Sequence, residues 1–248
     1  MLKVLLLDLD GTLLGNSMEL FVPAYLEALG GFLSNHVPPR RLVNELLNAT
    51  RVMAANDGTG ATNEELFASA FYPAVGRERA QLEPVIRRFY AEEFPKLRPL
   101  TRPVPEAPRL VEWAFGRGLQ VAIATNPLFP RTAIEQRLEW AGVGVQRFPY
   151  ALVTTYETMH ACKPHPAYYR EIFSLLGREP EECLMAGDDW GADIRPATGL
   201  GCPAWWVANP AAQPPAAPPR LVGQGRLSAL LDRLLAAESG LDPVLDLP

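Results

Sequence analysis

Acidic side chains are concentrated at two points of this chain, where carboxylates could bind a cation or take part in catalysis. Five of the nine aspartates lie in two short clusters: Asp8 and Asp10, then Asp188, Asp189 and Asp193. Each cluster lies at the end of a continuous apolar run, 3–9 or 183–187, of the kind typical of a buried strand. Burying acids in that position costs free energy unless they are paired or bind a cation, so their presence points to a function. Paired carboxylates either hold a hard cation such as Mg²⁺ or act as nucleophile and general acid–base.

Polar groups of other types accompany two further apolar runs. Thr125 and Asn126 end the run 119–125 and supply a hydroxyl and backbone amides suited to phosphate oxygens. Lys163 comes shortly after the run 150–154 and is one of only three lysines among 23 basic residues. A lysine is a compact positive charge that can neutralise phosphate and restrain a neighbouring carboxylate.

The elements that must position these groups alternate between strands and helices over most of the chain. Apolar runs predict five strands, at 3–9, 119–125, 150–154, 183–187 and 204–208. Helical periodicity predicts the intervening helices, at about 106–117, 129–141, 165–177 and 191–200. This alternation predicts an α/β fold, a doubly wound parallel Rossmann-like sheet covered on both faces. Because ligands bind at the carboxyl ends of such strands, we expect the polar groups to meet at one edge of the sheet.

Two segments depart from the alternation. The stretch 16–100 predicts four helices, at roughly 17–33, 40–55, 62–75 and 78–94, and therefore a helical insertion with 97–105 as its return linker. The sheet-bearing core would then comprise 1–15 and 101–248. Near its end, 209–220 has five prolines in twelve residues and should be extended. The segment 226–237 has the leucine spacing of an amphipathic helix, which would pack on its own core or on a second copy.

Composition restricts the function classes. The chain has 248 residues and a formal net charge of −5, whereas a nucleic-acid surface needs clustered positive charge. No apolar run approaches the roughly 20 residues that cross a bilayer, and the acids at 8 and 10 argue against a signal peptide. Three cysteines without metal-site spacing suit a reducing compartment. We therefore expect a cytoplasmic protein, monomeric or homodimeric, without nucleic-acid or membrane partners.

The motifs, taken together, resemble a known family. DLDGT (8–12), ATN (124–126), KP (163–164) and GDDWGAD (187–193) resemble, in order and spacing, the four motifs of the haloacid dehalogenase (HAD) superfamily of hydrolases. The motif-bearing resemblance covers about 1–15 and 100–208, and the insertion 16–100 is similar to the C1 cap of that superfamily. Each motif alone is a weak signal, whereas the ordered set on strand ends is a strong one.

The resemblance implies a role for each matching residue. Asp8 would be the nucleophile that forms an aspartyl-phosphate, and Asp10 would protonate the leaving oxygen and then activate water. Thr125 and the backbone amide of Asn126 would hold phosphate oxygens, and Lys163 would neutralise charge around them. Mg²⁺ would be bound by Asp8, Asp188 and the backbone carbonyl of Asp10, with Asp193 or Asp189 acting partly through water. Such a site positions the phosphoryl group and stabilises its charge.

The resemblance also separates branches of the superfamily. Dehalogenase members lack an acid two residues after the nucleophile, because halide leaves without protonation, and Asp10 therefore favours phosphoryl transfer. Phosphonatase-like members use a cap lysine, and 16–100 contains only Lys96, at its far end. We predict a Mg²⁺-dependent phosphatase acting on a small phosphorylated metabolite. The alternatives are a phosphomutase of the β-phosphoglucomutase type and a non-catalytic binding protein on the same fold. Selectivity is expected in the loop 56–61 and just after the first motif, at Asn16, Ser17 and Glu19.

Overall fold

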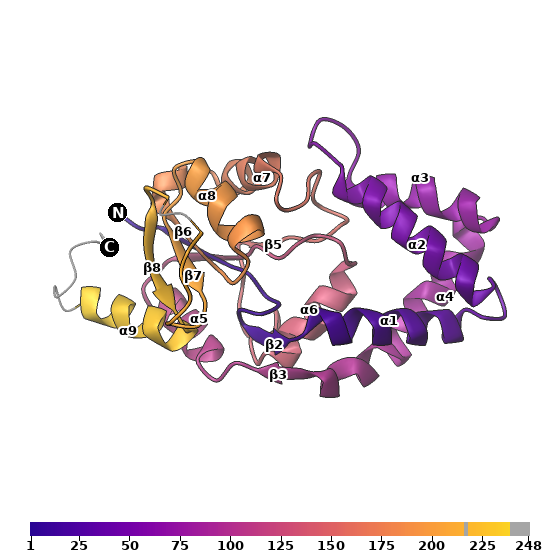
Figure 1. The fold of residues 1–248 in the computed structure, drawn as a ribbon, viewed down its shortest axis with the longest axis horizontal. Coiled ribbons are helices and arrows are strands. Elements are labelled where there is room, and N and C mark those ends of the chain that lie inside the picture. The colour runs from indigo at the N-terminus through magenta and orange to yellow at the C-terminus, as the bar shows by residue number, and fades with distance from the viewer. Residues whose placement is uncertain (216–217, 239–248) are drawn as a thin grey trace.

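A six-stranded parallel sheet forms the centre of the protein (Figure 1), which we describe from a computed structural model covering residues 1–215 and 218–238. The strand order is β5-β4-β1-β6-β7-β8. The strands are β1 (Val4–Leu7), β4 (Gln120–Ile123), β5 (Leu152–Val153), β6 (Cys183–Gly187), β7 (Ala204–Val207) and β8 (Leu221–Gly225). The chain leaves β1 and builds the sheet outward on both sides of it. The predicted doubly wound α/β fold is therefore confirmed.

Helices cover both faces of the sheet because the strands are apolar on both sides. They are α5 (Ala107–Gly116), α6 (Arg131–Trp140), α7 (Pro166–Leu176), α8 (Arg195–Gly199) and α9 (Leu227–Glu238). In β1, Leu5 and Leu7 belong to one buried cluster together with Leu110 of α5 and Leu230 of α9. The alternate residues of β1 join the opposite cluster, which includes side chains of α7 and α8. This alternation holds β1, and the aspartate that follows it, at the centre of the molecule.

Three strands were not expected from the sequence. β8 follows the proline-rich stretch and pairs with β7, and its two glycines conceal any strand pattern. β2 (Leu14–Asn16) and β3 (Thr101–Pro103) form an antiparallel pair of three residues each, too short for periodicity to show. The five strands predicted from apolar runs all correspond to strands of the sheet. Of the predicted core, 216–217 and 239–248 lie outside the described residues.

A layer of helices follows β2 and returns to the sheet at β3. It comprises α1 (Met18–Phe32), α2 (Pro39–Ala54), α3 (Asn63–Val75), α4 (Arg79–Glu92) and the 3-10 segment η1 (Phe94–Leu100), and Figure 1 shows α1–α4 beside the sheet. The start of α3 is fixed by a capping box between Thr62 and Glu65. Aromatic side chains, among them Phe21, Tyr25 and Phe94, pack edge to face inside the layer.

The link between α2 and α3 rests on the chain that follows β5. The backbone N–H of Asn63 donates to the carbonyl of Met159 at 2.8 Å, and that of Glu64 donates to the carbonyl of Tyr156 at 2.8 Å. The side chain of Asn63 also donates to the carbonyl of Ala161 at 3.2 Å. These bonds tie the helical layer to the segment between β5 and Lys163. Within the described part of the chain, no helix has the length and apolar character that a membrane-spanning segment requires.

Candidate active site

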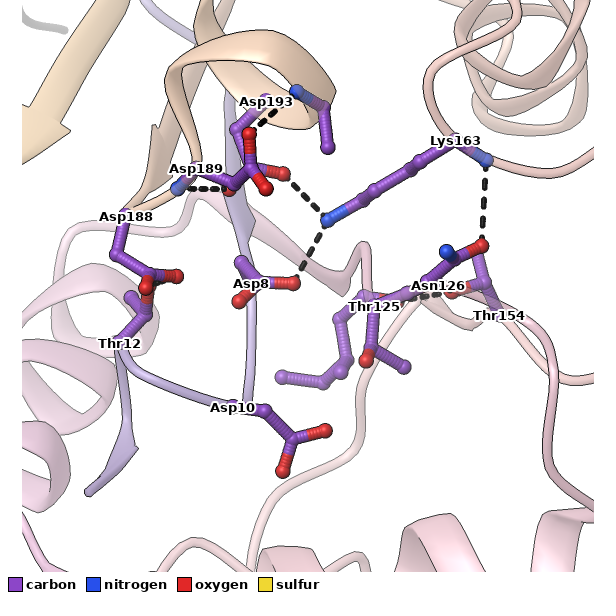
Figure 2. Close-up of polar contacts among 12 residues, drawn as sticks. Asp8, Asp10, Thr12, Thr125, Asn126, Thr154, Lys163, Asp188, Asp189 and Asp193 are labelled. Atoms are coloured by element: carbon purple, nitrogen blue, oxygen red, sulfur yellow. Dashed lines mark hydrogen bonds and ion pairs between the residues drawn. The ribbon is translucent and has the colours of Figure 1, made fainter. Parts of the chain in front are cut away.

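The predicted polar groups meet at the carboxyl edge of the sheet (Figure 2). Asp8 directly follows β1, and its backbone N–H still donates to the carbonyl of Ala186 in β6 at 3.0 Å. Asp188 directly follows β6, and Thr125 lies two residues beyond β4. The neighbouring strands thus bring residues far apart in the sequence to one place, as expected for a parallel sheet.

Lys163 joins two of the carboxylates. Its Nζ lies 2.7 Å from Oδ1 of Asp8 and 2.6 Å from Oδ1 of Asp193. The side chains of Lys163 and Asp193 are each 2% exposed, and that of Asp8 is 8% exposed. Figure 2 shows the lysine side chain reaching from its loop to a point between the two carboxylates. Charge-assisted hydrogen bonds at this depth fix all three groups in position.

Negatively charged groups outnumber positively charged ones in this cluster. Burial raises the pKa of Asp8 well above its ordinary value, because Asp193 and Asp188 add to the effect and Lys163 only partly opposes it. Burial alone would lower the pKa of Lys163, but Asp193 and Asp8 raise it well above its ordinary value. Partial loss of hydration and the charge of Asp193 raise the pKa of Asp188 to about 6. Three carboxylates and one ammonium therefore leave a net negative site, which a bound cation would stabilise.

Oxygen ligands for a metal are close together here. One carboxylate oxygen from each of Asp8, Asp188 and Asp193 lies within 4.8 Å of the other two. Asp188 is the exposed member, and Thr12 donates to its Oδ1 at 3.4 Å. The oxygens of Asp193 already accept from Lys163 and from the backbone N–H of Asp189 at 3.0 Å. An all-oxygen set with an exposed side suits Mg²⁺, which keeps several of its waters.

Two glycines leave room for these carboxylates. Gly11 has φ +84°, and a Cβ at this position would lie 2.2 Å from a carboxylate oxygen of Asp188. A Cβ at Gly187 would lie 2.2 Å from a carboxylate oxygen of Asp193. Any side chain at either position would displace an acid of the cluster. Gly11 of DLDGT and Gly187 of GDDWGAD therefore have a steric cause, and Gly11 has a conformational one as well.

The side chain of Asp189 accepts hydrogen bonds from the backbone of the turn that follows it. Its Oδ1 accepts the backbone N–H groups of Gly191 at 2.7 Å and Ala192 at 2.8 Å, so it caps the π-helical turn Trp190–Ile194. That turn carries Asp193 back toward Lys163. Asp189 thus positions the cluster from outside it, whereas the sequence left its role open.

Asp10 lies apart from the carboxylate cluster, as Figure 2 shows. Its Oδ1 accepts from Nδ2 of Asn16 at 2.9 Å, and its Oδ2 accepts from Nη1 of Arg137. Arg137 is 1% exposed, and its guanidinium lies 4.6 Å from the centre of the Phe129 ring. Nη2 of Arg137 and Oδ1 of Asn16 are buried without hydrogen-bond partners among the described residues. Such groups are costly to leave unpaired, and they face the acid that the motif predicts to be catalytic.

Hydrogen bonds to the main-chain carbonyl of Thr125 fix the segment that follows β4. The carbonyl of Thr125 accepts from Oγ1 of Thr154 at 2.7 Å and from the hydroxyl of Tyr168 at 2.8 Å. Oδ1 of Asn126 accepts the backbone N–H of Lys163 at 3.2 Å. The side chain of Thr125 is left to face the site, and Thr125 is 2% exposed. The predicted phosphate-binding residues are therefore tied to the loop that carries Lys163.

The histidines near the site have local partners. Nδ1 of His160 lies 2.7 Å from a carboxylate oxygen of Glu171. His165 caps α7, because its Nδ1 accepts the backbone N–H of Ala167 at 3.2 Å. His160 and His165 thus make local contacts with residues of α7.

The sequence did not identify several residues that contact the site, namely Thr12, Arg137, Thr154 and Tyr168. It also did not identify Asn16 as a partner of Asp10. Arg137 alone had a usable signal, because it interrupts the apolar face of a predicted helix that includes Ala133, Ile134 and Leu138. A charge on the buried face of a helix requires a partner. The other residues could not be distinguished from ordinary polar side chains before the strands were placed.

Comparison with known proteins gives one family match and several similar proteins. A family model described as a haloacid dehalogenase-like hydrolase matches residues 2–201. The phosphoglycolate phosphatase of Aquifex aeolicus (strain VF5) is 28% identical over 203 residues, which are 81% of this chain and 82% of the relative. Phosphoglycolate phosphatase 1 of Pseudomonas aeruginosa is 23% identical over 210 residues, 82% of this chain and 68% of the relative. Among solved structures, a HAD phosphatase from Thermococcus onnurineus has the same fold, with a TM-score of 0.58 at 21% identity over 94% of this chain and 98% of that one.

Proposed function

Because the chain belongs to the haloacid dehalogenase-like hydrolase family and is a phosphoric monoester hydrolase, we propose that it hydrolyses a small phosphorylated metabolite with Mg²⁺ through a phosphorylated Asp8. The observation that supports this most is the position of Lys163, which pairs with Asp8 on one side and Asp193 on the other. The lysine holds Oδ1 of Asp8 and leaves Oδ2 of the same carboxylate as the attacking atom.

The donor set fits Mg²⁺. Asp8, Asp188 and the backbone carbonyl of Asp10 would bind it directly. Asp193, whose oxygens already accept hydrogen bonds, would act partly through water. When bound, Mg²⁺ supplies positive charge that orients the phosphoryl oxygens and offsets the repulsion among the carboxylates. The raised pKa values of Asp8 and Asp188 are consistent with a site built for a cation.

The proposed reaction has two steps. Oδ2 of Asp8 attacks phosphorus, the P–O bond to the alcohol breaks, and Asp10 gives its proton to the departing oxygen. Asp10 then takes a proton from water, whose oxygen attacks phosphorus and breaks the P–O bond to Asp8. Inorganic phosphate is released, and the Asp8 carboxylate is regenerated with Asp10 protonated again.

The remaining polar groups hold the phosphoryl group. The Thr125 hydroxyl and the backbone amide of Asn126 donate to its oxygens, and Lys163 offsets the negative charge. Arg137 and Asn16 keep the Asp10 carboxylate in one orientation. Asp10 is thus presented from a fixed position in both steps.

The insertion 16–100 is proposed to act as a cap that covers this edge of the sheet, and the core to comprise 1–15 and 101–248. The bonds from Asn63 and Glu64 to the chain after β5 are the contacts that support this arrangement. A covered site excludes water until the second step. Cys162, Cys183 and Cys202 are free and buried, which supports the further proposal of a cytoplasmic location.

A phosphatase assay tests the proposal. Wild-type protein should release phosphate from a generic monoester such as p-nitrophenyl phosphate with Mg²⁺ and lose this activity with a chelator. Asp8→Asn should reduce kcat by about 10³-fold or more, because the amide is a poor nucleophile. Asp232→Asn changes an exposed aspartate of α9 in the same way and should leave activity at the wild-type level. Full activity in Asp8→Asn, or none in wild type with any divalent metal, would contradict the proposal.

A further inference from the structure

An apolar cavity of about 850 Å³ lies between the helical layer and the chain that follows β4. Its wall comes from α1, α2, α3 and α4 and from residues 128–132 and 156–157. Leu, Val, Ile, Met, Phe and Tyr side chains make up most of this wall. A cavity of this size is in the usual range for small-molecule sites. The phosphoryl chemistry proposed at Asp8 does not itself require such a space.

One end of the cavity adjoins the active site. Leu128 is part of the wall and donates its backbone N–H to the carbonyl of Asn126 at 2.8 Å. It is three residues beyond Thr125, so their Cα atoms are at most about 11 Å apart. The wall at this end is therefore in direct contact with Asn126, one of the residues proposed to hold phosphate.

Two other wall residues connect the cavity with Asp10. Met18 lines it, and Sδ of Met18 lies 3.6 Å from Nδ2 of Asn16, the group that donates to Asp10. Phe129 also lines it and lies beneath the guanidinium of Arg137, which pairs with the other oxygen of Asp10. The cavity thus begins beside the acid that would protonate the leaving oxygen.

The charges of the wall do not favour an anionic leaving group. Three glutamates, Glu64, Glu83 and Glu157, line the cavity with two arginines, Arg87 and Arg131. Both arginines already have acidic partners, because Arg87 pairs with Glu83 at 2.6 Å and Arg131 with Glu135 at 3.5 Å. Glu64 and Glu83 also pair with Arg79, so a second carboxylate on the substrate, as in phosphoglycolate, would meet no wall arginine that lacks an acidic partner among the described residues.

The tyrosines of the wall stay neutral. The hydroxyls of Tyr25 and Tyr90 lie 2.8 Å apart in a buried pair. Burial raises the pKa of Tyr25 to about 12 and that of Tyr90 well above its ordinary value. Burial, with Glu83, likewise raises the pKa of Tyr72 to about 12. The tyrosines of the wall are therefore uncharged, and Glu64, Glu83, Arg87 and Arg131 belong to ion pairs.

We propose that this cavity holds the hydrocarbon part of the substrate, which is then the phosphate monoester of a bulky apolar alcohol. The inference rests on the proposed function: phosphate lies at Asp8, the ester oxygen faces Asp10, and the hydrocarbon extends past Met18 and Phe129 between the helices. Transfer of methylene groups from water to this cavity supplies the binding free energy.

A series of n-alkyl phosphates from ethyl to octyl tests the proposal on the wild-type enzyme with Mg²⁺. Measured kcat/KM should rise about two- to fourfold for each added methylene until the cavity is filled. Phosphoglycolate should be hydrolysed with a lower kcat/KM than hexyl phosphate. A series that is flat or falls with chain length, or a preference for phosphoglycolate, would overturn the proposal.

A pair of matched variants places the effect in the cavity. Val22 lines the cavity on α1, and Val22→Phe should shorten the chain length at which kcat/KM stops rising. Val52 is 46% exposed on α2 and is not among the lining residues, so Val52→Phe should keep the wild-type series. If Val22→Phe does not fold, Ala91→Phe fills the same space from an exposed position on α4. An unchanged series in a folded cavity variant would overturn the proposal.

A binding measurement separates failure of this inference from failure of the proposed function. Calorimetric titration of Asp8→Asn with octyl and ethyl phosphate reports affinity without turnover, and octyl phosphate should bind at least 50-fold more tightly, roughly twofold for each added methylene. That preference in an enzyme that hydrolyses no ester would refute only the proposed chemistry. Hydrolysis of every ester with equal affinities would refute only the role of the cavity.

Discussion

The carboxyl edge of the sheet and the helical layer beside it use opposite kinds of interaction. At the edge, Lys163 lies between Asp8 and Asp193, and few polar atoms of the cluster lack a partner. In the helical layer, apolar and aromatic side chains enclose a cavity of about 850 Å³. Paired charges constrain the geometry of a site closely, whereas an apolar wall can bind any apolar group whose shape fills the cavity. We therefore propose that the chemistry takes place at the sheet edge and that the helical layer determines selectivity.

The two regions also differ in what limits their stability. The side chains of β1 are fully buried between the helices on either face. Several wall residues of the cavity, Leu46 among them, are only half-buried because they face an open space. Close packing should make the sheet intolerant of truncation, and the cavity should make its wall more tolerant.

The largest effect is expected at the charged edge. Lys163→Met should lower kcat by about 10²–10³-fold, because it removes the positive charge that Asp8 and the phosphoryl group share. The measurement is steady-state kinetics with p-nitrophenyl phosphate, with circular dichroism to confirm folding. Lys3→Met is the matched control, because Lys3 pairs with Glu182 at the surface and should keep wild-type kcat. Equal kcat in the two variants would show that the charge of Lys163 is not required for catalysis, and it would contradict the electrostatic role proposed for the sheet edge.

A smaller effect compares packing directly. Leu6→Ala in β1 should lower the free energy of unfolding by about 3 kcal/mol, because Leu6 is fully buried and leaves a cavity. Leu46→Ala at the cavity wall should cost only about 1 kcal/mol, because the space beside it already exists. Urea denaturation of both variants gives the two values. A cost at Leu46 as large as that at Leu6 would show that the helical layer is packed as tightly as the sheet.

The smallest effect is a pH dependence of metal binding. The pKa of Asp188 is raised to about 6, so the folded, metal-free protein takes up a proton here more readily than the unfolded chain. Its stability therefore falls as pH rises from about 4 through about 6, and Mg²⁺ competes with that proton. Mg²⁺ should bind about tenfold more weakly near pH 5 than near pH 7.5.

Thermal unfolding with and without Mg²⁺ measures this difference, and the increase in Tm should be larger near pH 7.5. Asp188→Asn replaces an anionic ligand with a neutral one that does not titrate, so its increase in Tm should be small at both pH values. An equal increase at both pH values in the wild-type protein would contradict the proposed metal site.

The sequence predicts the sheet edge well for a physical reason. Buried parallel strands are continuous apolar runs, and polar residues at their ends stand out against them, as Asp8, Asp188 and Thr125 do. The strands β2, β3 and β8 escaped because they are short or contain glycine. Their pairing depends on neighbours that no local pattern identifies.

The helical layer shows the opposite limit. Its four helices follow from periodicity, but the cavity depends on how they pack against one another and on 128–132. The partners of Asp10 were hidden in the same way: Arg137 lies on a helix 127 residues away, and only the fold brings the two together. Asp189 shows that even within one motif, sequence cannot separate an acid that caps a turn from acids that face the cluster.

The most direct test of the central claim is mass spectrometry of the enzyme quenched in acid within one turnover. With an alkyl phosphate and Mg²⁺, the peptide that contains Asp8 should gain the mass of one phosphoryl group, and the adduct should disappear as inorganic phosphate forms. The same peptide from Asp8→Asn should remain unmodified. Turnover without any adduct on Asp8, or an adduct on another residue, would contradict the account of Asp8 as the nucleophile.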